Sequence, residues 1–164
     1  MGAKLKIGVT RKLPASVEQR LAELFDAEFN GVDAPLSRDA LVALARRSDA
    51  LAPTLGDALD EAFFAACGDR LRLVANFGAG IDHIDVVAAA ARGITVTNTP
   101  SVLAEDAADM AMALILAVPR RLVEGVKALE NGEFKGWSPT WMLGSRVRGK
   151  KLGIIGLGRV GEAI

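Results

Sequence analysis

The sequence of 164 residues predicts an α/β fold, in which helices cover both faces of a parallel sheet. Three observations lead to this prediction. Short apolar runs of strand length alternate with helical segments from residue 5 to residue 97. Each strand and the helix after it form a unit of the size that joins neighbouring parallel strands. A glycine-rich turn, typical of nucleotide-binding sheets, follows a further apolar run near the C-terminus.

Strands and helices are predicted to alternate through the first part of the chain. The expected strands are Leu5–Thr10, Glu28–Val32, Ala50–Pro53, Leu71–Asn76 and Ile94–Thr97. The expected helices are Ala15–Phe25, a segment capped by Ser37 that ends at Arg46, a segment from Asp57 to about Cys67, and Asp85–Ala91, closed by Gly93. In the first of these helices the apolar residues recur on one side, which suits packing against the sheet.

A more apolar helix follows the last of these units. Pro100 near its first turn, with Glu105 and Asp106 soon after, suits a helix N-terminus and its dipole. Residues 110–117 are small and apolar on every side, which is typical of a buried helix. An ordinary core helix and a hinge helix wedged between two domains both explain this segment. Its place before a second nucleotide-type unit favours the hinge, and Pro119 can kink it.

The composition excludes several classes of protein. Apolar residues make up 51% of the chain, and Lys+Arg equals Asp+Glu at 20 each, so charge favours neither a nucleic acid nor an anionic membrane as partner. The one cysteine, Cys67, excludes an internal disulfide framework and suits a reducing cytosol. The longest apolar stretch, Met110–Val118, is too short to span a bilayer. A cytoplasmic protein is therefore expected.

The segment Asn76–Asp85 is the first of two glycine loops. It lies between an expected strand and an expected helix, at the sheet edge where open α/β sheets bind ligands. Gly78 and Gly80 permit backbone conformations in which successive N–H groups converge on an anion, so the loop could bind a small carboxylate. A plain tight turn also explains Gly-Ala-Gly, and taken alone it is the commoner explanation.

His83 is the only histidine, and it lies between Asp82 and Asp85. A neighbouring carboxylate can orient an imidazole for proton transfer. The sequence favours a polar residue at a helix start instead, because no companion acid, nucleophile or metal ligand stands at suitable spacing. Cys67 has no activating partner and is expected to be a small buried residue. No catalytic residue and no metal site is therefore assigned.

The second glycine loop follows the apolar run Lys151–Ile155, which is expected to be a buried strand. Gly156, Gly158 and Gly161 form G-x-G-x-x-G, the turn of dinucleotide-binding sheets. The first glycine permits the tight turn, the second lets the backbone approach a pyrophosphate, and the third lets the helix pack on the strand. The anion would lie on free N–H groups at the helix N-terminus.

Both tryptophans, Trp137 and Trp141, lie in an irregular segment from Gly132 to Gly149. Exposed indoles there would mark a surface for a partner or a substrate. Alternatively, both rings pin the loop to its own domain, and the sequence leaves these two interpretations even.

Taken together, these motifs resemble the D-isomer-specific 2-hydroxyacid dehydrogenases. The matching stretches are Asn76–Asp85, Asn98–Pro100, Ala108-Asp109, Arg120-Arg121 and Gly149–Gly161, in the family's order and spacing. Ala108-Asp109 departs slightly from the Ala-Glu pair common in the family, which affects the helix more than the chemistry. The segment Trp137–Gly144 is most similar to the glyoxylate and hydroxypyruvate reductase branch.

The resemblance implies a domain organisation and a set of binding residues. Residues 1–100 would form a flavodoxin-like substrate domain, and residues 101–164 the interdomain helix, a loop and the first strand of a Rossmann NAD(P)-binding domain. The substrate carboxylate would lie on the backbone amides of Ala79 and Gly80, beside the loop that contains Leu55. The cofactor pyrophosphate would contact the second glycine loop, at Gly156, Gly158, Arg159, Val160 and Gly161.

The resemblance also implies an oxidoreductase that transfers a hydride between NAD or NADP and a small 2-keto or 2-hydroxy acid, as a homodimer. The Trp-containing segment would be the arm toward the partner subunit. The family's catalytic arginine, glutamate and histidine match no position here, so these 164 residues, expected to be the N-terminal part of a reductase, should be inactive alone. Other members remain possible, of the phosphoglycerate or formate type. So does a non-catalytic, dinucleotide-dependent binding protein similar to corepressor relatives.

Overall fold

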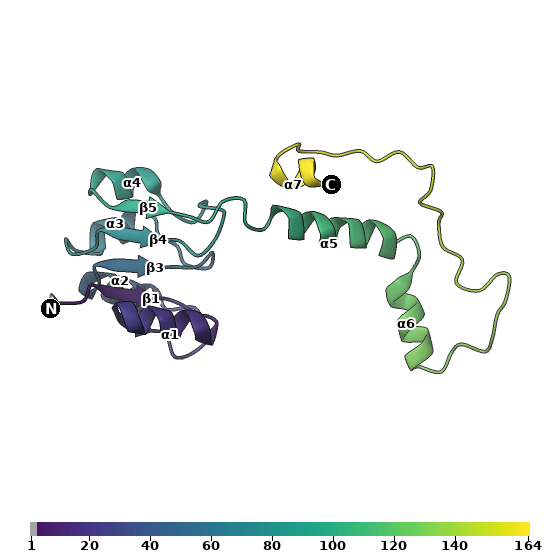
Figure 1. Cartoon of the computed structure of the whole chain (residues 1–164), viewed down its shortest axis with the longest axis horizontal. Helices are drawn as coiled ribbons and strands as arrows, with labels where there is room; N and C mark the ends of the chain where they lie inside the picture. Colours follow the sequence, from purple (N-terminus) through teal and green to yellow (C-terminus); the bar gives the residue numbers. More distant parts are fainter. Residues whose placement is uncertain (1–2) are drawn as a thin grey trace. The chain divides into compact units, whose positions relative to one another are not determined.

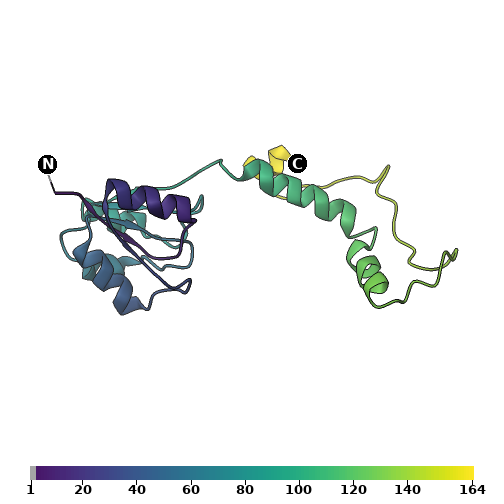
Figure 2. The ribbon, with the colours of Figure 1, turned by 60° about the horizontal axis from the view of Figure 1, so that its bottom comes forward.

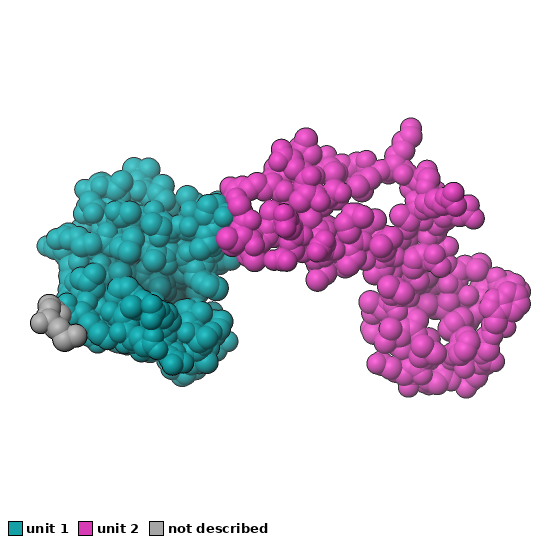
Figure 3. Space-filling view, in the orientation of Figure 1, with its two compact units in different colours: residues 1–100 teal, residues 101–164 magenta. Residues whose placement is uncertain are grey.

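The computed structural model describes residues 3–164, which divide into two units at Pro100 and Ser101 (Figure 3). The first unit contains a five-stranded sheet in which every strand pair is parallel. The strands are β1 (Lys6–Val9), β2 (Asp26–Phe29), β3 (Ala50–Ala52), β4 (Leu73–Ala75) and β5 (Thr95–Thr97) (Figure 1). The predicted α/β fold with a parallel sheet is confirmed.

The strand order is β2-β1-β3-β4-β5. The chain moves from β1 to one neighbour, β2, and then crosses to the opposite side of β1 to form β3. This order is that of flavodoxin-like folds, which bind ligands outside the carboxyl ends of the strands. The topology therefore directs attention to the loops that follow β1, β3, β4 and β5.

Four helices accompany this sheet. They are α1 (Ala15–Leu24), α2 (Arg38–Arg47), α3 (Glu61–Ala66) and α4 (Val86–Ala91). The predicted cap at Ser37 is confirmed, because its hydroxyl accepts a hydrogen bond from the Ala40 amide at 3.3 Å. The predicted stop at Gly93 is also confirmed: its φ is +68°, and its amide donates to the Ala90 carbonyl at 2.9 Å.

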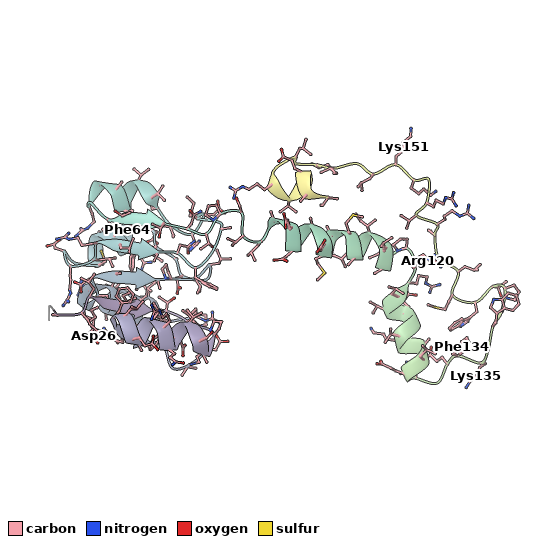
Figure 4. The ribbon with its side chains drawn as sticks, in the orientation of Figure 1. Asp26, Phe64, Arg120, Phe134, Lys135 and Lys151 are labelled. Carbon is pink, nitrogen blue, oxygen red and sulfur yellow. The ribbon has the colours of Figure 1, made fainter. Side chains whose placement is uncertain are left out.

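The core lies on the face of the sheet that carries α2, α3 and α4. Leu51, Leu59 and Phe63 are completely buried there, and the Phe64 ring, labelled in Figure 4, packs edge-on against Phe63 at 5.2 Å between centroids. Helix α1 contributes no buried residue, and Figure 2 shows it on the opposite side of the sheet from α2. The first unit is thus packed much more densely on one face than on the other.

Three predicted boundaries are wrong. Helix α3 begins at Glu61, not at Asp57, because the Asp57 carboxylate is engaged elsewhere and Asp60 caps the helix through the Phe63 amide at 2.8 Å. Strand β2 begins at Asp26, two residues before the predicted start at Glu28, because its register with β1 pairs Lys6 with Asp26. The helix expected from Pro100 begins only at Ala104.

The second unit contains α5 (Ala104–Ala117), α6 (Leu122–Glu130) and α7 (Arg159–Ala163). Ser101 delays the start of α5, since its φ of 72° lies in the left-handed region. Arg121, with φ 55°, separates α5 from α6 after the break at Pro119. Helix α7 lies against α5 (Figure 1).

Two features of the second unit differ from the patterns in the sequence. Helix α5 has the apolar pattern of a buried helix, but residues 101–164 leave it exposed: only Ala108 is enclosed, while Met110 is 61% and Leu114 54% exposed. The run Lys151–Ile155 forms no strand, because a parallel strand needs a hydrogen-bonding neighbour and the described residues 101–164 contain none. Figure 4 shows Lys151 on this unpaired segment. Among residues 3–164, no helix is long and apolar enough to cross a membrane.

Candidate functional site

Two loops meet at the carboxyl edge of the sheet in the first unit. The loop after β3 contains Thr54, Leu55 and Asp57, and the loop after β4 runs from Asn76 to His83. The Phe77 amide donates to the Pro53 carbonyl at 2.9 Å, which extends the parallel pairing of these strands into the loops. The edge therefore holds both loops in a defined register.

The Asn76 side chain lies beneath the first glycine loop. It is 3% exposed, and its Nδ2 donates to the carbonyls of Gly78 at 3.2 Å and Gly80 at 2.9 Å. Its Oδ1 lies 3.0 Å from His83 Nε2. Because both Nδ2 hydrogens point to carbonyl oxygens, Oδ1 is left as an acceptor and Nε2 of His83 carries the hydrogen.

A second asparagine, at the end of β5, contacts the same loop. Asn98 Nδ2 donates to the Ala79 carbonyl at 2.7 Å, and the Thr99 amide donates to the Gly78 carbonyl at 3.0 Å. In contrast, the N–H groups of Ala79, Gly80 and Ile81 have no hydrogen-bond acceptor among residues 3–164. The loop thus has tethered carbonyls and free donors, which is the arrangement an anion requires.

The loop after β3 is held by Asp57. This carboxylate is 3% exposed, and its Oδ2 accepts from the Thr10 hydroxyl at 2.5 Å and from the Thr54 amide at 2.8 Å. The bond to Thr10 ties the loop to the end of β1, at the point where the strand order reverses. No partner within residues 3–164 accepts the N–H groups of Leu55 and Gly56.

Apolar side chains surround the free donors. Leu55 is 61%, Phe77 56% and Ile81 38% exposed. A Cβ added to Gly78 would lie 2.8 Å from a terminal methyl of Leu55, so the two loops are in close contact. Backbone donors with an apolar rim suit a small organic acid: the donors bind its carboxylate, and the rim excludes water from the rest.

His83 and Cys67 take the structural roles that the sequence favours. His83 lies in the turn before α4, where its ring bonds to Asn76 and its carbonyl accepts the Leu59 amide at 2.9 Å. Cys67 is fully buried, and burial raises the pKa of its thiol, whose Sγ donates to the Phe64 carbonyl at 3.2 Å. The described residues contain no cluster of side chains suited to a metal ion.

The roles of the Asn76, Asn98 and Asp57 side chains at this site were not predicted from the sequence. Asn76 and Asn98 directly follow β4 and β5, and Asp57 lies in the loop after β3, so all three stand at the sheet edge where ligands bind. The bonds from Asp57 to Thr10 and from Asn98 to Ala79 join residues far apart in the sequence, so only the folded sheet reveals them.

The second glycine loop has the local geometry of a phosphate-binding turn. Gly156 has a φ of +93°, and a Cβ added to Gly161 would lie 2.3 Å from the Gly156 carbonyl oxygen. Gly158 caps α7, and no heavy atom lies within 4 Å of a Cβ built on it, so a side chain would fill open space beside the helix N-terminus. Arg159 anchors the turn by donating to the Ser101 hydroxyl at 3.1 Å. These residues fit the pyrophosphate of a dinucleotide.

The two tryptophans divide between the two interpretations of their segment. Trp141 packs against Phe134 with ring centroids 5.3 Å apart, and both rings line an apolar hollow beside α6 with Leu122 and Val126. Trp137 is 86% exposed. One ring therefore pins the loop to its own unit, while the other presents an indole to solvent.

Comparison with known proteins identifies the family. Residues 7–155 match the family model of the D-isomer specific 2-hydroxyacid dehydrogenases, catalytic domain. The chain belongs to this family. The resemblance carried by the two glycine loops is thereby confirmed.

Curated relatives and solved structures agree with this assignment. The chain is 41% identical to a glyoxylate reductase of Pyrococcus horikoshii over 165 residues, and 42% identical to one of Thermococcus kodakarensis over 163 residues. These matches cover 98% and 97% of the chain but 49% of each relative. The chain thus spans about half the length of the curated relatives it matches.

The fold matches solved dehydrogenase structures over nearly its whole length. A Polaromonas protein described as a D-isomer specific 2-hydroxyacid dehydrogenase, NAD-binding, is 34% identical, with a TM-score of 0.90 over 98% of this chain and 50% of that one. An NADPH-dependent glyoxylate/hydroxypyruvate reductase of Sinorhizobium meliloti, solved with NADP and malonate, is 35% identical. Its TM-score is 0.79, and the match covers 98% of this chain and 49% of that one.

Proposed function

We propose that this chain is part of an NAD(P)-dependent reductase that transfers a hydride to C2 of a small 2-keto acid, with glyoxylate and hydroxypyruvate as substrates. The observation that carries the proposal is the row of free amides at Ala79–Ile81, whose carbonyls are tethered and which lie beside an apolar rim. Membership of the 2-hydroxyacid dehydrogenase family supports the reaction class. The similarity to glyoxylate reductases supports the substrates.

In this proposal residues 1–100 are the substrate domain. The substrate carboxylate accepts hydrogen bonds from the N–H groups of Ala79 and Gly80, and Leu55 contacts the rest of the molecule. Backbone amides bind a carboxylate without a cationic side chain, so directed hydrogen bonds hold the substrate rather than the attraction of a charged residue. Holding one end of a two- or three-carbon acid fixes the position of C2, which is what hydride transfer requires.

Residues 101–164 belong to the nucleotide domain in this proposal. Gly156, Gly158, Arg159, Val160 and Gly161 would hold the pyrophosphate of the dinucleotide. The reduced form, NADH or NADPH, would supply the hydride from its nicotinamide ring. The geometry of Gly156 and Gly161 fits this role, as described above. The residue that chooses between the two nucleotides is expected about 20 positions after the fingerprint.

The proton transfer and the polarisation of the keto group are assigned to residues outside this chain. The family resemblance implies an arginine, a glutamate and a histidine for these steps. The only histidine here, His83, is bonded to Asn76 beneath the loop and supports the loop rather than the chemistry. We also propose a cytoplasmic homodimer, in which the exposed Trp137 contacts the partner subunit. The balanced charge supports neither a nucleic acid nor a membrane as partner.

The test is a substrate panel on the complete protein that contains this chain. Oxidation of NADH and NADPH is followed with glyoxylate and hydroxypyruvate, and reduction of NAD⁺ and NADP⁺ with 3-phosphoglycerate and formate. The proposal expects kcat/KM to be highest for glyoxylate or hydroxypyruvate. A preference for 3-phosphoglycerate or formate would refute the substrate assignment. A protein that binds dinucleotide but reduces no keto acid would support a non-catalytic binding role.

Two variants at one position test the carboxylate site itself. Gly80→Pro removes the N–H donor, whereas Gly80→Ala keeps it and adds a Cβ that meets Asp82 Oδ2 at an ordinary 3.6 Å. Loss of one hydrogen bond to a charged group should raise KM for glyoxylate about 10-fold or more in Gly80→Pro. Gly80→Ala should stay within about 3-fold of the wild type. Equal KM values for both variants would exclude the Gly80 amide as a ligand.

A further inference from the structure

The direction of the free amides follows from the geometry of the peptide bond. In a trans peptide unit, the carbonyl of one residue and the N–H of the next lie in one plane and point in opposite directions. The Gly78 carbonyl and the Ala79 N–H share one unit, and the Ala79 carbonyl and the Gly80 N–H share the next. Whatever holds a carbonyl therefore aims the following N–H away from itself.

Each of these two units is held by a different asparagine. Asn76 Nδ2 at 3.2 Å, together with the Thr99 amide at 3.0 Å, holds the Gly78 carbonyl and so aims the Ala79 amide. Asn98 Nδ2 holds the Ala79 carbonyl at 2.7 Å, and so aims the Gly80 amide. The two proposed carboxylate donors thus each have one asparagine on the far side of their own peptide unit.

We propose that Asn76 and Asn98 are positioning residues that preorganise the carboxylate-binding amides of Ala79 and Gly80. The proposal rests on the function proposed above and deepens it, because it names the groups that set substrate affinity without touching the substrate. Glycine-flanked loops sample many backbone conformations, and fixing each residue in one of them costs conformational entropy. Hydrogen bonds to the loop carbonyls fix these residues when the protein folds, so the entropy is not lost again when the substrate binds.

The Asn76 tether depends on His83. A free carboxamide can rotate by half a turn and present its oxygen, rather than its two donors, to the loop. With Nε2–H of His83 on Oδ1 at 3.0 Å, such a rotation would bring two donors together at His83 and an acceptor against two carbonyls. The neutral Nε2–H tautomer and the imidazolium both satisfy this bond. His83 therefore locks the carboxamide in one orientation.

The two asparagines differ in a way that makes the inference testable. Asn76 is buried, so its substitution can disturb folding. Asn98 is exposed and makes its side-chain bond only to Ala79 within the described residues 3–164, so its substitution should leave the fold intact. Asn98→Asp is isosteric but replaces the donor with an acceptor. Asn98→Gln keeps the donor on a longer, flexible side chain.

The experiment uses the complete protein that contains this chain, with two measurements for each variant. Steady-state kinetics give KM and kcat for glyoxylate and KM for the dinucleotide. Calorimetric titration gives the dissociation constant of malonate, as an unreactive carboxylate probe, with and without dinucleotide. Asn131→Asp serves as the matched control, because it makes the same change at an exposed asparagine whose Nδ2 bonds to Glu133 in the other unit.

The expected result is a change in carboxylate affinity alone. Asn98→Asp should raise KM for glyoxylate and the malonate dissociation constant about 10-fold, with the dinucleotide KM and the melting temperature unchanged. Asn98→Gln should restore most of the affinity, and Asn76→Asp should lose at least as much as Asn98→Asp. Asn131→Asp should behave as the wild type.

The two proposals fail in different ways. If the wild type reduces glyoxylate and binds malonate, but Asn98→Asp does both equally well, the positioning role is refuted and the proposed function stands. If the wild type reduces no keto acid yet binds malonate, a 10-fold weaker binding by Asn98→Asp supports the positioning role, and the proposed reaction falls. If the wild type does neither, both proposals are overturned.

Discussion

The two units of this chain show what the same apolar composition achieves with and without a sheet. In residues 3–100, Leu51, Leu59 and Phe63 are completely buried between parallel strands and the helices α2–α4. In residues 101–164, the buried apolar side chains are those of Ala108 and Ala128. Large apolar residues are abundant there too, but Ile155 is fully exposed and Val118 is 70% exposed.

The difference follows from how each element buries its apolar surface. Hydrogen bonds join the five strands into one sheet, and this sheet offers two faces on which several helices bury their apolar sides. Residues 110–117 of α5 are apolar on every side and need partners all round, but α7 covers only part of the helix. The first unit therefore forms a core from its own apolar residues, whereas the second carries an apolar surface that its own residues do not cover.

The largest expected effect is on the free energy of unfolding, when a leucine is replaced by alanine once in each unit. Leu59→Ala removes a side chain with no exposed surface, and should lower the free energy of unfolding by about 2–5 kcal/mol. Leu114→Ala, at a side chain that is 54% exposed, should change it by about 0.5 kcal/mol or less. Urea unfolding of the chain, followed by far-UV circular dichroism, measures both. Equal losses would show that α5 is buried in solution.

A second, smaller effect distinguishes two glycines of the second glycine loop, one by stability and the other by dinucleotide binding. Gly161→Ala places a Cβ 2.3 Å from the Gly156 carbonyl oxygen, so the turn must open, and the complete protein should lose about 1–3 kcal/mol of stability. Gly158→Ala meets no atom within 4 Å, so its stability should be unchanged, while its methyl group fills the space proposed for the pyrophosphate. The melting temperature and the NADH dissociation constant distinguish these outcomes. A Gly158→Ala protein that binds NADH normally would contradict the phosphate site.

The smallest expected effect contrasts a tertiary ion pair with a local one. A hydrogen bond from Arg47 on α2 lowers the pKa of Glu28 on β2, and a hydrogen bond from Arg121 lowers the pKa of Glu124 one turn along α6. A lowered carboxyl pKa stabilises the fold above the usual value of 4.5, and this contribution is lost as the pH falls through the lowered value.

Arg47→Gln should therefore lower the free energy of unfolding at pH 7 by about 0.5 kcal/mol, because both side chains of the pair are partly exposed and screened by solvent. The difference from the wild type should disappear as the pH falls below 4.5. Arg121→Gln, in the uncovered unit, should leave the global transition unchanged. Urea titrations at a series of pH values measure this, and a difference that grows toward acid pH would rule out the Glu28 pair as its source.

The fold of the first unit was largely readable in the sequence. Every predicted strand before residue 98 is present. Ser37 caps the start of α2 and Gly93 follows the end of α4, as their residue types suggest. The start of α3 was predicted wrongly, because Asp57 precedes an apolar helix and resembles a cap. Its carboxylate instead binds Thr10, which is 47 residues away along the chain. Local pattern could not reveal a partner that only the strand order brings near.

The candidate sites divide in the same way. The second glycine loop depends on residue type alone, because Gly156 adopts a φ of +93° and Gly161 leaves no room for a Cβ beside the Gly156 carbonyl. The motifs also determined the family, because their order and spacing are written along the chain. The strand at Lys151–Ile155 was not determined in this way, because strand pairing requires a neighbour.

Only the tertiary structure decided which groups support the first glycine loop. Asn76 and Asn98 stand at the ends of β4 and β5, and become neighbours because these strands pair in parallel. The sequence by itself determined an α/β protein with two glycine turns and a family. The fold then decided that the donors of the first turn face outward, because carbonyl tethers from two adjacent strands fix the planes of its peptide units.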